Sequence, residues 1–176
     1  MMREQGLALL DRWYASGWVR SLDLAFARFL GDLDPQADAL VLIAGCCVSA
    51  YLGRGHICLP LRQLYDDANA LLNLSDERLH GQEAYQDLPS QCLPQDPAMW
   101  LAALTQSSLL MSDSGPLVLA GERLYLRRYW RYEVDVAQAI KDRVAIDCVW
   151  PDDLRQRLDS LFPETQSAQP DWQKIA

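Results

Sequence analysis

One stretch of the sequence, residues 40–52, is apolar on nearly every side, and only Gly45 and Ser49 interrupt it. Asp34-Pro35 supplies an N-cap and a first-turn proline ahead of this stretch, and Gly53 supplies a stop, so we predict one helix between them. The stretch is well short of the roughly 20 apolar residues that span a bilayer. A helix that is apolar all round is buried all round, so we expect it to be the central helix of the fold.

Two amphipathic helices are expected ahead of this central helix. Residues 4–16 place apolar side chains three or four apart and stop at Gly17, which is typical of a helix that ends in a glycine. Residues 21–30 follow, with Ser21 as a candidate N-cap and Asp23 in the first turn, where an acidic side chain interacts well with the helix dipole. The apolar face of this second helix is expected to consist of Leu22, Ala25, Phe26, Phe29 and Leu30.

The sequence changes character after Gly53. A short candidate strand at 56–59 precedes a helical period over 60–72, and a second helix is expected at 98–106. Two apolar runs around Gly121 then predict a β-hairpin over 116–126. Strand, helix, helix and hairpin follow one another as in a winged-helix module.

The polar segment 73–96 lies within this module. It carries Pro89 and Pro94, and we expect either a long loop or a weak helix around residues 75–81 flanked by loops. Loops of this length inside compact domains are uncommon and often contact a partner. We therefore treat it as a candidate contact.

Two further helices, 129–144 and 151–162, are expected before a linker. Residues 171–176 then begin a helix too short to sustain itself, because nucleation costs more than so few hydrogen bonds return. We therefore expect a piece of a longer chain. The predicted fold class is mainly α, a helical bundle with a winged-helix-like module that carries a small β-hairpin. The predicted parts are an N-terminal helical part (1–53), the module (54–127), a helical connector (128–163), and a linker with the truncated start of a further domain (164–176).

The charge and the motifs exclude several classes of function. The chain has 16 Lys+Arg against 24 Asp+Glu and a net charge of -8, which disfavours non-specific binding of nucleic acid by the whole surface. Neither GxxxxGK[ST] nor GxGxxG occurs, so nucleotide hydrolysis by this chain alone is excluded. The two histidines stand in no HExxH or HxE frame. We predict no catalytic residue.

The cysteines suggest buried thiols rather than a metal site. His56, Cys58, Cys46 and Cys47 could supply four zinc ligands, but the sequence lacks a CxxC pair and the ligand spacing of a zinc finger. We predict no metal site and keep a small metal-dependent enzyme as the weakest functional alternative. The odd total of 5 cysteines and the lack of an apolar signal core favour reduced thiols, a cytoplasmic location and no membrane partner.

The basic residues concentrate in one stretch, residues 123–132, together with aromatic residues. This combination suits single-stranded nucleic acid, and it equally suits a protein interface. Because Glu133 and Asp135 follow at once, we favour an interface or intramolecular packing. The candidate interface residues are Arg123, Tyr125, Arg127, Arg128, Tyr129 and Trp130, with Arg131 and Tyr132 beside them.

A winged helix also suggests a stand-alone regulator that reads duplex DNA. Its recognition helix would be residues 97–106, which contain no basic residue. Base and phosphate contacts require Arg, Lys, Asn or Gln on that helix. The module is therefore better suited to protein than to DNA, and the DNA-binding regulator is kept as the alternative function.

Three runs of residues, in this order along the chain, resemble one family. They are 22–27 (LDLAFA), 55–61 (GHICLPL) and 121–130 (GERLYLRRYW), and they are similar to the N-terminal region of the exodeoxyribonuclease V alpha subunit, RecD. The ending, with Leu161-Phe162-Pro163, a linker and 171–176, resembles the approach to the helicase motor domain of that family. The resemblance spans residues 22–176.

The resemblance implies a subunit of the RecBCD helicase–nuclease, which processes broken duplex ends in recombinational repair. In that family the alpha subunit is a 5′ to 3′ motor that uses ATP and Mg²⁺ and handles the DNA. Its N-terminal domain docks on the gamma subunit, RecC, within a complex that also contains the beta subunit, RecB. Gln173 matches a glutamine that contacts the adenine of ATP in related helicases, a contact expected only in a full-length parent.

We therefore predict a non-catalytic assembly domain that attaches a helicase motor to its complex. The mechanism is burial of apolar and aromatic surface, with residues 73–96 and 123–132 as candidate contacts. No cofactor is expected for this chain alone.

Overall fold

Helix α3 (Ala39–Leu52) is the central helix that the sequence predicts, and its residues 39–50 are all buried. The structure is a computed structural model that describes residues 2–74, 87–111, 113–147 and 151–162. It divides into two compact units, residues 1–135 and 136–176, and α3 belongs to the first.

The start of α3 differs from the prediction. The helix is capped by Asp38, whose side chain accepts a hydrogen bond of 2.7 Å from the backbone N–H of Leu40. Asp34 instead ends the preceding helix, and its carboxylate accepts the backbone N–H of Gln36 at 3.0 Å. The predicted cap at Asp34-Pro35 is therefore wrong, because a turn separates these residues from the helix.

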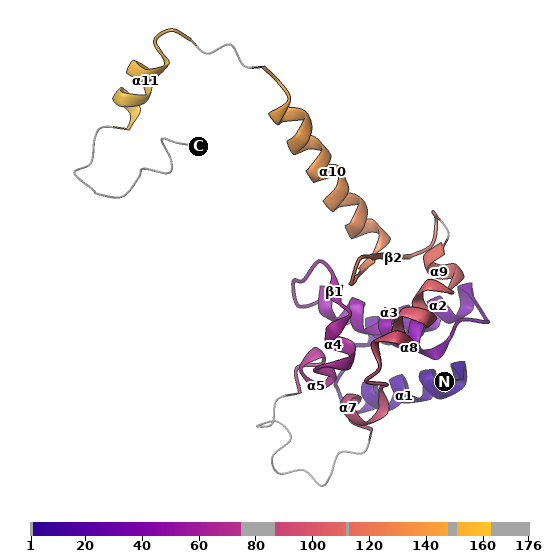
Figure 1. The fold of residues 1–176 in the computed structure, drawn as a ribbon. Coiled ribbons are helices and arrows are strands. Elements are labelled where there is room, and N and C mark those ends of the chain that lie inside the picture. The colour runs from indigo at the N-terminus through magenta and orange to yellow at the C-terminus, as the bar shows by residue number, and fades with distance from the viewer. Residues whose placement is uncertain (1, 75–86, 112, 148–150, 163–176) are drawn as a thin grey trace. The chain divides into compact units, whose positions relative to one another are not determined.

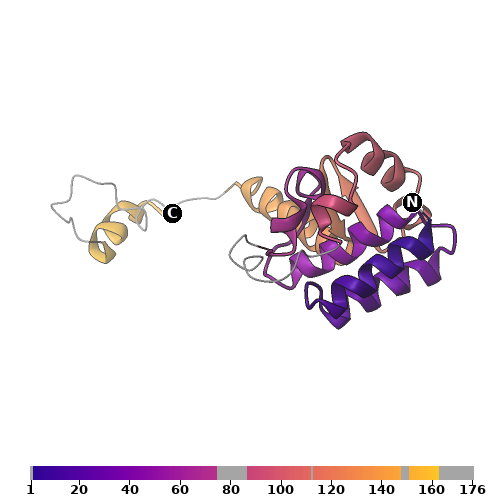
Figure 2. The same ribbon diagram turned by 90° about the horizontal axis from the view of Figure 1, so that it is seen from below.

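Two helices, α1 (Arg3–Ala15) and α2 (Ser21–Leu33), pack on α3 and on each other (Figures 1 and 2). Glycines allow α1 and α2 each to approach α3 closely. A Cβ atom at Gly6 would lie 2.6 Å from the Cβ of Ala39, and one at Gly45 would lie 2.3 Å from a methyl carbon of Leu30. These distances are shorter than real Cβ contacts, so each glycine leaves the space that its neighbour occupies, Ala39 beside Gly6 and the Leu30 side chain beside Gly45.

The buried face of α2 is rotated from the predicted one. Leu24, Ala27 and Leu30 are buried, whereas Leu22 is 65% and Phe29 50% exposed. Both sets repeat at helical spacing, and the packing against α3 selects the first. The predicted N-cap is also wrong. Ser21 is already helical, and the carboxylate of Asp23 accepts the backbone N–H of Arg20, the capping residue, at 2.9 Å.

A small antiparallel sheet completes the fold, as the predicted mainly α class with a hairpin requires. Strands β2 (Leu117–Ala120) and β3 (Arg123–Leu126) form the hairpin, and Gly121 has a φ of 58° in its turn. Strand β1 (Leu59–Pro60) pairs with β3, so that the strand order is β1-β3-β2. The first strand therefore lies slightly later in the chain than the predicted 56–59.

Short helices connect the strands. They are α4 (Arg62–Tyr65), α5 (Ala68–Leu71), α7 (Pro89–Cys92), α8 (Pro97–Thr105) and α9 (Ser108–Met111). The continuous helix predicted over 60–72 is divided because Asp67 leaves the helical conformation, with φ at -146°, and its side chain caps α5. Helix α8, the would-be recognition helix, buries Trp100 and Leu104.

One hydrophobic core joins the helices to the sheet. Trp13 of α1, Leu42 and Ile43 of α3, Trp100 of α8 and Leu124 of β3 all belong to it. Burial of apolar surface of this kind contributes roughly 25 cal/mol per Å². The core is continuous across the predicted boundary at residue 53, and the four-part division of the chain stays a prediction.

Helix α10 (Arg127–Val144) follows β3 directly, and α11 (Leu154–Leu161) lies in the second unit. Neither helix contains a buried residue. Among the residues that the structure describes, no helix combines the length and the hydrophobicity needed to cross a bilayer.

Candidate functional site

The predicted interface residues lie on two consecutive elements. Arg123 and Tyr125 are on β3, and Arg127, Arg128, Tyr129 and Trp130 form the first turn of α10. The chain passes from strand to helix without a loop, so the six residues form one continuous corner. Their side chains nevertheless have different environments.

Tyr125 and Trp130 pack against each other. Tyr125 is only 2% exposed, and its ring centroid lies 5.0 Å from that of the partly buried Trp130. Burial raises the pKa of Tyr125, and Cys58 and Glu133 add to this effect while the hydrogen bond with Arg123 opposes it. A partner could not reach Tyr125 without opening this corner, so its role here is intramolecular packing.

Arg127 ties the hairpin to α10. Its side chain donates to the backbone carbonyls of Gly115 and Leu117, the latter at 3.2 Å, and its backbone N–H donates to the carbonyl of Pro116 at 2.8 Å. These bonds satisfy carbonyl groups at the entrance to β2. Arg127 therefore fixes the helix to the sheet.

Arg128, Tyr129 and Tyr132 form an exposed cluster. The Nε of Arg128 donates to the hydroxyl of Tyr132 at 2.8 Å, and the guanidinium lies 5.4 Å from the centre of the same ring. The hydrogen bond with Tyr132 is the main reason that the pKa of Arg128 is raised. Tyr129 meets Tyr132 edge to face, with 6.2 Å between ring centroids. The aromatic surface is thus preformed, which lowers the entropy lost on binding.

A groove of about 670 Å³ lies beside this cluster. It is lined by Phe26 of α2, by the segment 114–116 ahead of β2, and by Arg128, Arg131 and Tyr132 of α10. Sequence reasoning placed the arginines and the tyrosine here but missed Phe26 and Pro116. Phe26 was assigned to the apolar face of its own helix, and no local signal indicates that it faces a helix a hundred residues later.

The second predicted contact, segment 73–96, is described only at its ends, because residues 75–86 lie outside the described residues. Its later end is fixed to α1. The carboxylate of Asp87 accepts from the Nε of Arg12 at 2.6 Å, and its backbone carbonyl accepts from the indole N–H of Trp13 at 2.9 Å. Asp87 has a φ of 72°, a conformation that Asp tolerates better than most residues. Trp13, to which the sequence assigns no role, therefore anchors this segment.

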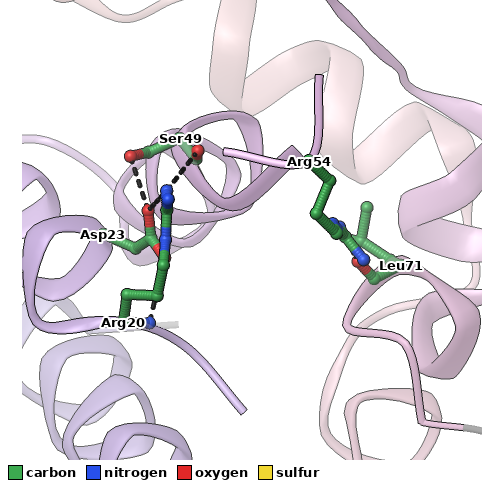
Figure 3. A network of polar contacts seen from close by, with 5 residues as sticks. All are labelled: Arg20, Asp23, Ser49, Arg54 and Leu71. Carbon is green, nitrogen blue, oxygen red and sulfur yellow. Dashed lines mark hydrogen bonds and ion pairs between the residues drawn. The ribbon is translucent and has the colours of Figure 1, made fainter. Parts of the chain in front are cut away.

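A buried carboxylate, that of Asp23, lies in the first turn of α2. Asp23 is fully buried and accepts hydrogen bonds from Arg20 at 2.6 Å and from the hydroxyl of Ser49 at 2.7 Å (Figure 3). Burial alone raises the pKa of Asp23, but the hydrogen bonds from Arg20 and Ser49 outweigh it, so the net pKa is lowered. Arg20 also donates to the backbone carbonyl of Ser49 at 3.0 Å, which joins α2 to α3. The carboxylate of Asp23 is therefore used in hydrogen bonds that hold the fold together, and we assign it a structural role.

The residues considered above as possible zinc ligands lie in different environments. Cys46 and Cys47 are buried in α3, and burial raises the pKa of both thiols, that of Cys47 to about 12. His56 stacks on the ring of Tyr51, with 3.9 Å between centroids. In the described ranges no three His, Cys, Asp or Glu side chains gather as metal ligands would. Gln173 lies outside the described residues.

Comparison with known proteins identifies one family. The model of the family described as "RecBCD enzyme subunit RecD, N-terminal domain" matches residues 15–125. The RecBCD enzyme subunit RecD of Buchnera aphidicola subsp. Schizaphis graminum is 22% identical over 170 residues, which cover 96% of this chain and 26% of that protein.

Two mycobacterial relatives match a shorter part of the chain. RecD of Mycobacterium tuberculosis (strain CDC 1551 / Oshkosh) is 35% identical over 132 residues, which cover 69% of this chain and 20% of that protein. RecD of Mycolicibacterium smegmatis is 33% identical over 118 residues, 67% of this chain and 18% of that protein. The chain thus spans 18% to 26% of the length of these relatives.

Proposed function

Because the chain belongs to the family of N-terminal domains of the RecBCD enzyme subunit RecD, we propose that it is a non-catalytic assembly domain of such a subunit. Its role is to dock the parent subunit into a RecBCD-type complex. The observation that carries this proposal is the exposed arginine and aromatic surface at the start of α10, held in place by the packed corner of Tyr125 and Trp130. Tyr, Trp and Arg are the residues that most often anchor protein interfaces.

The partner that the proposal names first is a RecC-like gamma subunit, within a complex that also holds a RecB-like beta subunit. The curated relatives are called subunits of the RecBCD enzyme, and the family resemblance of the sequence supports the gamma subunit as the docking partner. The parent motor would supply DNA handling, ATP hydrolysis, Mg²⁺ binding and the adenine contact of Gln173. Repair of double-strand breaks is then the process that the complex serves.

The alternative function, a winged-helix regulator of DNA, lacks this support. The surface of α8 carries Met99 and Leu101, each about half exposed, where a DNA reader needs basic or amide side chains. An apolar surface on this helix suits contact with protein.

The test is capture of the purified gamma subunit of the same organism by the purified chain. We expect the two to elute together in size-exclusion chromatography, and the complex to survive moderate salt because aromatic burial contributes to it. The competing arm is a titration with duplex DNA at several salt concentrations. Tight duplex binding with a steep salt dependence, and no capture of the gamma subunit, would replace the assembly domain by the DNA-binding regulator.

A further inference from the structure

The groove beside α10 combines an apolar floor with a basic rim. Phe26 is partly buried against the core, and Pro116 and Leu126 continue the floor. Arg128 and Arg131 form the rim, and Tyr132 lines the groove beside them. A ligand that fits both parts needs negative charge and at least one apolar side chain.

The positive charge of the rim is not neutralised within the described part of the chain. Arg128 and Arg131 are exposed, and no carboxylate there, including that of Asp135 in the same groove, comes within ion-pair distance of either. Both lie in the first two turns of α10, whose first turn contains no acidic residue. Because a helix N-terminus carries partial positive charge, cations there are disfavoured and an incoming anion is favoured.

Arg128 keeps hydrogen-bonding capacity for such an anion. Its Nε is used by the hydroxyl of Tyr132, at 2.8 Å, which holds the guanidinium in one orientation. The two terminal nitrogen atoms remain, and in this planar group they can together bind one carboxylate. Tyr132 thus positions the arginine in addition to contributing its ring.

Arginines commonly bind two kinds of polyanion, nucleic acid and acidic protein segments, and the lining of the groove decides between them. The net charge of -8 on the whole chain repels both of them and therefore does not decide between them. Asp135 also lines the groove and would oppose a phosphate, whereas its carboxylate can accept a peptide N–H. A phosphodiester backbone offers no apolar side chain that could pack on the apolar floor. The carboxylate of Asp135 and the apolar floor therefore favour a protein segment.

We propose that this groove binds an acidic segment of the partner subunit, with carboxylates on Arg128 and Arg131 and one apolar side chain on the floor formed by Phe26, Pro116 and Leu126. This inference rests on the proposed assembly function and assigns to it a site and a ligand chemistry. The segment is recognised by alternating Asp or Glu around a single large apolar residue.

The first experiment measures binding of three labelled probes to the full 176-residue chain by fluorescence anisotropy. The probes are a short peptide of Asp and Glu around one Phe, the same peptide with Asn and Gln in place of the acids, and a short oligothymidylate. We expect the acidic peptide to bind, its affinity to fall as salt is added, and the amide peptide to bind far more weakly. Failure of the acidic peptide to bind, or equal binding of the amide peptide, overturns the inference.

Two groove variants and a matched control locate the binding. Arg128→Gln and Arg131→Gln are each expected to weaken the acidic peptide about tenfold or more, because each removes a charge-assisted hydrogen bond. Arg62→Gln removes the same charge from an exposed position of α4 and is expected to leave the affinity for the acidic peptide unchanged. Oligothymidylate that binds more tightly than the acidic peptide and is released by Arg131→Gln would reassign the groove to nucleic acid. Thermal unfolding followed by circular dichroism verifies that each variant is folded.

The gamma subunit separates this inference from the function on which it rests. We expect the double variant Arg128→Gln, Arg131→Gln to lose capture of the gamma subunit, and the acidic peptide to compete for it. Undiminished capture by the double variant overturns the groove and leaves the assembly function standing. If the wild-type chain binds the peptide but never captures the gamma subunit, the assembly function fails and the acidic ligand class remains.

Discussion

Asp23 illustrates the cost of a charge inside a helical core. Its carboxylate is fully buried and is bonded to the Arg20 guanidinium, the Arg20 backbone N–H and the Ser49 hydroxyl. We expect Asp23→Ala to lower the free energy of unfolding by about 2 to 3 kcal/mol, because the three donors lose their acceptor. The half-exposed Arg20 can turn to water, which keeps the loss at the lower end for a buried ion pair.

Urea unfolding followed by circular dichroism measures this loss. The matched control is Asp32→Ala, which removes a largely exposed carboxylate of α2, the helix that also carries Asp23. This carboxylate lies 3.5 Å from the guanidinium of Arg3 on α1. An exposed pair of this kind contributes about 0.2 to 1 kcal/mol at most. Equal losses in the two variants would contradict the role given to Asp23.

The same carboxylate makes stability depend on pH. The folded-state pKa of Asp23 lies below its ordinary value of 3.8. Its contribution is therefore fully present above that ordinary value and is lost as the pH falls through the folded-state pKa. We expect the stability difference between the wild type and Asp23→Asn to shrink when the pH is lowered from about 6 to about 3, since the variant has no proton to take up at this position. A difference that stays constant over this range would show that the charge of Asp23 is not what stabilises the fold.

At the scale of elements, the contact between α1 and α3 depends on the absence of one side chain. A Cβ at Gly6 would meet both the Cβ and the backbone Cα of Ala39, at 2.6 and 3.2 Å. Alanine gains about 1 kcal/mol of helix propensity over glycine, but overpacking of a rigid contact costs about 1 to 3 kcal/mol. Because a backbone atom cannot rotate away, we expect Gly6→Ala to be destabilising.

The control for Gly6→Ala is Ala8→Gly, at an exposed position of the same helix, which measures the difference in helix propensity alone. Chemical unfolding of both variants gives the balance of the two effects. A Gly6→Ala protein that gains what Ala8→Gly loses would show that the two helices have room to separate.

The elements themselves were more predictable than their ends and faces. The apolar stretch of α3 predicts a buried helix because no other environment suits it, but Asp34 and Asp38 are equally good caps by local chemistry. In α2, the exposed Leu22 and Phe29 stand two helical turns apart, and the buried Leu24, Ala27 and Leu30 stand three residues apart, so both sets fit one face of a helix. Only the position of the neighbouring helix decides between such alternatives, and that information is not local in the sequence.

At the scale of the molecule, the candidate site was also predictable only where it depends on neighbouring residues in the chain. The arginines and aromatic residues of 123–132 are close together in the sequence, so their location at one corner of the fold was predictable. Their division into a packed pair, Tyr125 and Trp130, and an exposed cluster around Arg128 was not, because it depends on which side of β3 faces the core. The groove requires Phe26 to lie opposite α10, which only the tertiary fold provides.

The second unit is expected to contribute little to the stability of the first. Beyond Asp135 the described residues of α10 and α11 include none that is buried. We therefore expect a chain that ends at Asp147 to unfold within about 0.5 kcal/mol of the whole chain, as exposed surface changes usually do. Urea unfolding of the two chains side by side checks this. A larger loss would show that residues beyond 147 cover part of the core.

The burial of α3 also has a consequence for the order of synthesis. Its cover comes from α1 and α2, made before it, and from α8, β1 and β3, made after it. When the chain has emerged as far as Gly53, α1 and α2 can already cover one side of this largely apolar helix. The other side stays uncovered until residues as late as Leu126 have been made. During that interval the exposed side is a surface for chaperones or for aggregation, as in other chains whose contacts close late.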